Sequence, residues 1–189
     1  MKNAKLAMIL GLSVVLVAGA VFSAALAGTY AQAQSEQSDR LNVHDRVTAA
    51  IADGRRGGAV GVLSSIQTDP NGNEWIIYGP WWLVLIPAAD EAQSPEMIFK
   101  SGFGMVLKDG NSKHRHQISD FELTKWSADE TSITFEGTAT ITQRDGPVEN
   151  VPVTIKILND NVIEISIDTS VISHFGESPI YGMVLRSRL

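Results

Sequence analysis

"VPVTIKILNDNVIEISID", residues 151–168, is the stretch of sequence that decides the fold, because its side chains alternate between apolar and polar. Seven apolar residues have odd numbers, and Leu158 and Val162 beside the loop depart from the pattern; the seven are Val151, Val153, Ile155, Ile157, Ile163, Ile165 and Ile167. A period of two predicts two β-strands with one apolar face each. A hairpin keeps both apolar sets on one face if Ile157 pairs with Ile163. The loop is then residues 159–161, and we expect its last residue, Asn161, to adopt the left-handed conformation.

The same alternation runs through the chain from Ala59 onward, with turn signals such as "DPNGN", "DGNS", "SADE" and "RDGP" between the apolar segments. The connections are too short for crossover helices, so neighbouring strands should be antiparallel. Residues 59–189 are therefore predicted to form a single all-β domain of about eight or nine strands. Each sheet would have one solvent-exposed face and one apolar face that must be buried, which requires a sandwich or a closed barrel. Of these two, we expect the sandwich.

The first 33 residues have the layout of an export signal. Lys2 and Lys5 precede an uncharged apolar run from Leu6 to Ala27, and the small residues Ala31 and Ala33 follow. This predicts a signal peptide cut after Ala33. Residues 6–27 would measure about 33 Å as a helix, which is also long enough for a membrane anchor. Under both interpretations the rest of the chain is extracytoplasmic.

Residues 34–58 separate this segment from the β domain. The start, "QSEQSDR", is polar and predicts a flexible linker. The next stretch, "VHDRVTAAIAD", has helical apolar spacing and is followed by Gly54, so we expect one short helix over 43–53.

Charge and composition exclude some classes of partner. The chain has a net charge of -6, and loss of residues 1–33 would remove two lysines and no acids, which leaves -8. An acidic domain lacks the basic surface that nucleic acids require. The chain contains no cysteine, so it has neither disulfides nor thiolate metal ligands. Packing must therefore supply its stability.

Two of the four histidines lie in "DGNSKHRHQISDF", residues 109–121. On a strand, His114 and His116 point the same way. A hairpin with the preceding strand places them opposite odd-numbered apolar residues, on the apolar face. Phe121 is odd-numbered, so on a regular strand it would point away from the histidines. This leaves two alternatives. With a bulge near Ser119–Asp120 the histidines face the interior; without one they lie in solvent.

A metal would need a third ligand, and His174 in "ISHFGESPIYG" is the candidate. Three imidazoles without a thiolate suit Cu or Zn, with water in the open position, where a zinc-bound water could act in hydrolysis. The alternative is that His114 and His116 are structural or surface residues. In that case Phe175 and Ile180 anchor a plain loop around His174.

Adjacent tryptophans in "GPWWLVLIP" must point to opposite faces of a strand. At most one of Trp81 and Trp82 can therefore lie in the core. The other could bind a glycan or an envelope protein, or be partly covered by a neighbouring loop.

Five segments together carry a resemblance: "GPWWLVL", "FKSGFGMVLKDGNSKHRHQISDF", "FEGTATIT", "VPVTIKI" and "HFGESPIYG". They resemble uncharacterised small exported β proteins of ammonia-oxidising archaea, over roughly residues 75–184. The resemblance implies an archaeal envelope location and draws attention to copper. It supplies no catalytic residues.

Three functions remain open from the sequence. The first is a non-enzymatic extracytoplasmic domain at the cell envelope with a binding or structural role. The second is a Cu or Zn protein that uses His114, His116 and His174, either for metal binding alone or as a metal-dependent enzyme. The third is a barrel that holds a small apolar ligand. Motifs for nucleotide binding and serine or zinc hydrolysis are absent from the sequence, so we assign no catalytic residue.

Overall fold

The computed structural model describes residues 45–46, 48–49, 53–88 and 95–189. The predicted signal peptide or anchor therefore lies outside the described residues, as does most of the predicted helix over 43–53. Of that helix, the described residues Asp45, Arg46, Thr48 and Ala49 are helical, and the Asp53 amide donates a hydrogen bond to the Ala49 carbonyl (2.9 Å). Within the described ranges, no helix has the length and apolar character to cross a membrane.

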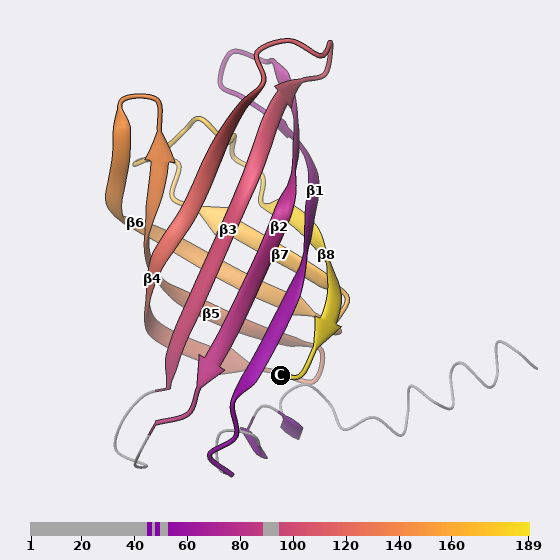
Figure 1. Ribbon diagram of the computed structural model, residues 1–189, viewed down its shortest axis with the longest axis vertical. Helices are drawn as coiled ribbons and strands as arrows, with labels where there is room; N and C mark the ends of the chain where they lie inside the picture. Colours follow the sequence, from indigo (N-terminus) through magenta and orange to yellow (C-terminus); the bar gives the residue numbers. More distant parts are fainter. Residues whose placement is uncertain (1–44, 47, 50–52, 89–94) are drawn as a thin grey trace, which may run out of the picture. The chain divides into compact units, whose positions relative to one another are not determined.

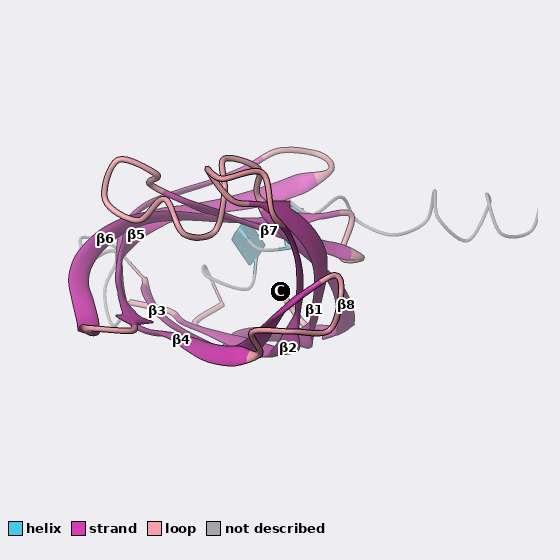
Figure 2. Ribbon diagram, turned by 90° about the horizontal axis from the view of Figure 1, so that it is seen from above, coloured by secondary structure: helices cyan, strands magenta, loops and turns pink. Residues whose placement is uncertain are grey.

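The described chain is an antiparallel barrel of eight strands, in which each strand pairs with the next and β8 pairs back with β1 (Figures 1 and 2). The strands are β1 (Gly57–Thr68), β2 (Glu74–Ile86), β3 (Glu96–Leu107), β4 (His114–Ala128), β5 (Ser132–Gln143), β6 (Gly146–Leu158), β7 (Val162–Ile167) and β8 (Ile180–Ser187). The all-β prediction is confirmed. The expected sandwich is wrong, because the sheet closes on itself.

The seam between β1 and β8 explains why the sandwich expectation failed. Leu63 lies opposite Gly182 and Ala59 opposite Ser187, with a register shift between Val60 and Gly61. A Cβ on Gly61 would lie 2.0 Å from the Met183 carbonyl oxygen, so only glycine fits there. This pairing joins the first and last strands, and local alternation carries no signal for such a distant contact.

The β6–β7 hairpin has the predicted register, since Ile157 pairs with Ile163. The loop conformation differs from the prediction. Positive φ angles occur at Asn159 (47°) and Asp160 (56°), not at Asn161, whose amide donates to the Leu158 carbonyl (2.9 Å). Positive φ at both central residues is the type I′ turn, whose twist matches that of the two strands.

Apolar side chains fill the barrel interior. The largest fully buried ones include Trp81, Phe99, Phe103 and Phe135. Trp82, next to Trp81, points outward and is 38% exposed, so the prediction that the two tryptophans occupy opposite faces is confirmed. We refer to residues 42–189 as the barrel unit, because the contacts divide the chain after Leu41. The barrel unit contains every strand and the whole described core, so it has what it needs to fold alone.

A bulge divides β4. The register with β5 shifts between Ser119 and Glu122, and Asp120 has a positive φ of 51°. Before the bulge, even-numbered residues such as His116 are buried; after it, Phe121 is buried. The predicted bulge near Ser119–Asp120 is thus confirmed, together with the interior orientation of His116.

Candidate metal centre

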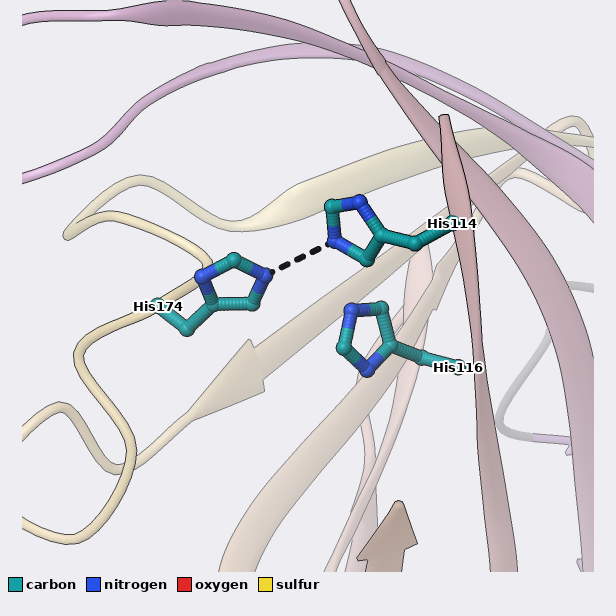
Figure 3. A group of neighbouring side chains, drawn as sticks. All are labelled: His114, His116 and His174. Carbon is teal, nitrogen blue, oxygen red and sulfur yellow. Dashed lines mark hydrogen bonds between the residues drawn. The ribbon is translucent and has the colours of Figure 1, made fainter. Parts of the chain in front are cut away.

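The structure brings the three candidate histidines together at one end of the barrel (Figure 3). His114 and His116 begin β4, and His174 lies in the loop between β7 and β8. One ring nitrogen from each histidine lies within 4.8 Å of the other two. The rings come from two segments that are distant in sequence, yet each turns a nitrogen toward a common point.

The strand pairing positions His114 and His116 as the sequence predicts. His116 lies opposite Phe103, and His114 lies opposite Met105. Phe103 and Met105 are both fully buried, so this is the apolar face of the hairpin.

His116 is the innermost of the three and is only 6% exposed. Its Nδ1 lies 2.7 Å from the Thr142 carbonyl oxygen. Because a carbonyl can only accept, Nδ1 must carry the proton, which leaves a lone pair on Nε2 in the neutral ring. Nε2 is buried and has no hydrogen-bond partner among the described residues. The fold thus places an imidazole lone pair, without a hydrogen-bond partner, where solvent has little access.

His114 is oriented in the same way. Its Nδ1 lies 2.7 Å from the Ser112 carbonyl oxygen, so the proton again belongs on Nδ1 and the lone pair on Nε2. The Nε2 of His114 lies 3.1 Å from the Nε2 of His174. Without a metal, His174 would donate its Nε2 proton across this gap. Two nitrogens about 2.05 Å from one tetrahedral zinc ion would be about 3.3 Å apart, so the spacing also suits coordination.

His174 is held by the loop that precedes β8. Phe175 is buried (2% exposed), and Ile180, the first residue of β8, is also buried. Gly176 has a positive φ of 79° and packs against the Thr68 carbonyl. The buried Gln67 side chain donates through Nε2 to the Pro179 carbonyl (2.7 Å). The anchors expected for a plain loop are therefore present, and they fix the position of His174.

Three aromatic residues surround the histidines, and the sequence did not single them out for this role. Phe175 packs against both His116 (5.0 Å between ring centroids) and His174 (5.3 Å). Phe103 lies beside His116, and Trp75 lies edge-on to His114 at 5.1 Å. Aromatic residues on alternating strands usually indicate only a core, so no sequence signal marked them.

Asp69 holds Trp75 in place. Its Oδ2 accepts hydrogen bonds from the Trp75 indole Nε1 (3.0 Å) and from the Asn73 side chain (2.9 Å). These bonds, with that to Asn73 first, lower the pKa of Asp69 to about 2. The carboxylate is therefore charged at all ordinary pH values and is an orienting group that the sequence analysis did not identify.

The surroundings favour the neutral forms of His116 and His174. Burial lowers the pKa of His116, more than the hydrogen bond to Thr142 raises it, and the nearby His174 and His114 lower it further. Burial and His114 likewise lower the pKa of His174, against the opposing effect of Asp69. Neutral imidazole is the form that binds metals, so His116 and His174 are already in their ligating state near pH 7.

The comparisons with known proteins add no family. No protein-family model, curated protein or solved structure matches the chain. The resemblance to exported archaeal β proteins stays a prediction.

Proposed function

We propose that this chain binds one transition-metal ion, Cu or Zn, through His114, His116 and His174, in an extracytoplasmic domain at the cell envelope. The observation that carries the proposal is the buried, unpartnered Nε2 of His116, which faces two further imidazoles. The proposed ligands are the three that the sequence suggested.

The energetics favour a ligand at this point. A buried polar atom without a partner costs about 1–3 kcal/mol. Phe103 and Phe175, which flank His116, offer it no hydrogen bond. A metal ion would satisfy the lone pairs of His114 and His116 at once, and the Thr142 and Ser112 carbonyls already fix both rings in the ligating tautomer.

The ligand set narrows the choice of metal. The cluster consists of nitrogen donors only, and the chain has no cysteine. Imidazole ligands suit Zn and Cu, and copper(II) binds more tightly than zinc at a given nitrogen site. We therefore expect copper where both metals are available. The resemblance to exported proteins of ammonia-oxidising archaea points to the same metal.

Three histidines leave at least one coordination position for water or another small ligand. The polar ends of His114 and His174 are only partly buried, whereas His116 is buried, so this position would open on the side of the two outer rings. Such a site could store or transfer a metal ion, or activate a bound water.

The test is metal binding by the barrel unit. We expect isothermal titration to give one Cu(II) per chain with a dissociation constant of about 1 μM or lower. His116→Phe should weaken binding at least about 100-fold, because it removes one ligand and leaves the packing intact. Arg115→Ala is the matched control, since Arg115 lies between the two histidines on the exposed face of the strand.

Two results would refute the proposal. The first is a wild-type barrel unit that takes up neither Cu(II) nor Zn(II) at micromolar concentration. The second is equal affinity in the wild type and the His116→Phe variant, which would place any bound metal elsewhere.

A further inference from the structure

One wall of the barrel, formed by the outer faces of β8, β1 and β2, carries an unusual share of exposed apolar side chains. We call this the apolar wall. Of the large apolar residues that are exposed in the described part of the chain, all except Val171 belong to it: Val60, Ile66, Ile76, Tyr78, Trp82, Tyr181, Met183 and Leu185. Leu185 is 66% exposed and Met183 is 53% exposed. Contiguous apolar surface of this kind marks interaction sites.

The strand register makes these side chains neighbours. Val60 lies opposite Trp82 on β2 and opposite Arg186 on β8. One row further along the barrel, Val62 lies opposite Met183. The three strands are adjacent in the barrel (Figure 1), so the apolar residues form one continuous surface.

The row of the apolar wall that contains Trp82 is flanked by basic residues. Within β1, β2 and β8 the only charged residues are Glu74 and Arg186, and Glu74 is paired with Lys108 (2.7 Å). Arg186 is exposed in the same row as Trp82, and exposed Lys100 of β3 lies on the other side of Trp82. This row of the wall is therefore apolar and basic, although the chain as a whole is acidic and Glu164 of β7 lies opposite Tyr181 at the edge of the wall.

We propose that the apolar wall docks on the surface of a lipid bilayer that contains anionic lipids. Lys100 and Arg186 would meet the negative headgroups. Met183 and Leu185 would enter the boundary between headgroups and acyl chains, and Trp82 suits the same level because its ring is apolar while its N–H is polar.

Charge also decides against a second copy of this chain as the occupant. In a two-fold symmetric dimer the same wall faces itself, which would bring Lys100 and Arg186 of both copies into one interface. Within the three strands the acidic residue Glu74 already pairs with Lys108, and Glu164 of neighbouring β7 lies opposite Tyr181, outside the row of Lys100 and Arg186. An anionic membrane supplies the missing charges.

The predicted N-terminal segment is compatible with docking on a bilayer. The apolar run ends at Ala27 and β1 begins at Gly57. If the run stays in the membrane, it holds the barrel close to the bilayer and raises the effective concentration of the apolar wall there. The docking proposal does not depend on retention of this segment, and it does not depend on the metal site.

The experiment uses the barrel unit, which lacks residues 6–27, and measures its co-sedimentation with vesicles of phosphatidylcholine and phosphatidylglycerol. We expect binding to these vesicles and much weaker binding to pure phosphatidylcholine. The double variant Met183→Ser/Leu185→Ser should reduce binding by at least about tenfold, because two exposed apolar side chains are lost. Val171→Ser is the matched control, since Val171 is equally apolar and 48% exposed but lies outside the wall.

A second pair of variants tests the charge. Lys100→Gln and Arg186→Gln should each weaken binding by about fivefold and reduce its sensitivity to salt. Circular dichroism would confirm that each variant keeps the β-barrel. Three outcomes overturn the proposal: no binding of the wild-type barrel unit to anionic vesicles, equal binding by the Met183→Ser/Leu185→Ser variant, or self-association in sedimentation analysis that the same variant abolishes.

Discussion

The two halves of β4 differ in which residues face the interior, although they belong to one strand. Before Asp120, His116 and Ile118 point inward; after it, Phe121 does. The first half contributes two histidines to the candidate metal centre, and the second half contributes apolar packing. The bulge at Asp120 allows one strand to serve both purposes, because it changes the parity that a regular strand would keep.

Removal of the bulge should have the largest effect. Asp120→Pro keeps the residue count but fixes φ near −65°, so the strand can no longer form the bulge, and either His116 and Ile118 or Phe121 would have to turn outward. We expect the barrel unit to lose at least about 4 kcal/mol of free energy of unfolding in urea titration. Asp120→Gly keeps the residue count and tolerates the positive φ, so it should cost less than about 1 kcal/mol. Equal losses of unfolding free energy in both variants would show that the bulge does not determine which side chains of β4 face the interior.

Point substitutions in the two halves should separate stability from metal binding. Phe121→Ala should lower the free energy of unfolding by about 3 kcal/mol, since its ring is buried and packs against Phe99. Its affinity for Cu(II) should stay within a few-fold of the wild type. His116→Phe should weaken metal binding at least about 100-fold and change stability by less than about 1 kcal/mol, because removal of the unpartnered Nε2 offsets the lost hydrogen bond to the Thr142 carbonyl. If His116→Phe destabilises as much as Phe121→Ala, the histidine serves packing.

The partner strand offers a smaller test of the same bulge. A Cβ on Gly137 of β5 would lie 2.1 Å from the Glu122 carbonyl oxygen and 2.8 Å from the Phe121 ring. Gly137→Ala should therefore cost about 1–3 kcal/mol in urea titration. Gly102→Ala on β3 is the control, because nothing lies within 4 Å of its added Cβ, and it should have almost no effect. Similar values for the two would mean that β5 moves aside without cost.

The smallest expected effect is the pH dependence of the metal-free barrel unit. The pKa values of His116 and His174 lie below the ordinary value of 6.5 in the folded state. As the pH falls below 6.5, the unfolded chain takes up protons that the folded chain refuses, so stability decreases, by at most about 1.4 kcal/mol per pH unit for each group. The decrease ends once the folded pKa values are passed.

The measurement is urea unfolding between about pH 7.5 and pH 5. His116→Phe should reduce the slope of stability against pH in this range. Asp69 and Asp129, each with a pKa of about 2, affect the stability only at more acidic pH. The same slope in the wild type and the variant would show that His116 does not titrate differently on folding.

Much of the fold followed from local alternation. The period of two in residues 151–168 correctly paired Ile157 with Ile163. The parity change between Ile118 and Phe121 correctly raised the bulge as an alternative. Both features are local, since each depends only on neighbouring residues of one or two strands. The closure of the barrel through β1 and β8 was not accessible, because no residue of either strand identifies so distant a partner.

The candidate centre shows the same limit. Strand spacing placed His114 and His116 on one face, but His174 was proposed only because it was the remaining suitable histidine. Its proximity depends on a loop held by Phe175 and Gln67, contacts that arise only when the barrel is complete. The roles of Thr142 and Ser112 were also hidden, because they act through backbone carbonyls and any residue type provides one.

The pairing of the first strand with the last has a consequence for the order of synthesis. A ribosome finishes β8 only after every other strand has left it, so a nascent or prematurely terminated chain has open edges on β1 and on its last completed strand. Any product that ends before residue 174 also lacks the third histidine. Proteases should therefore clear truncated chains readily, and only the full-length product can both close the barrel and assemble the three-histidine cluster.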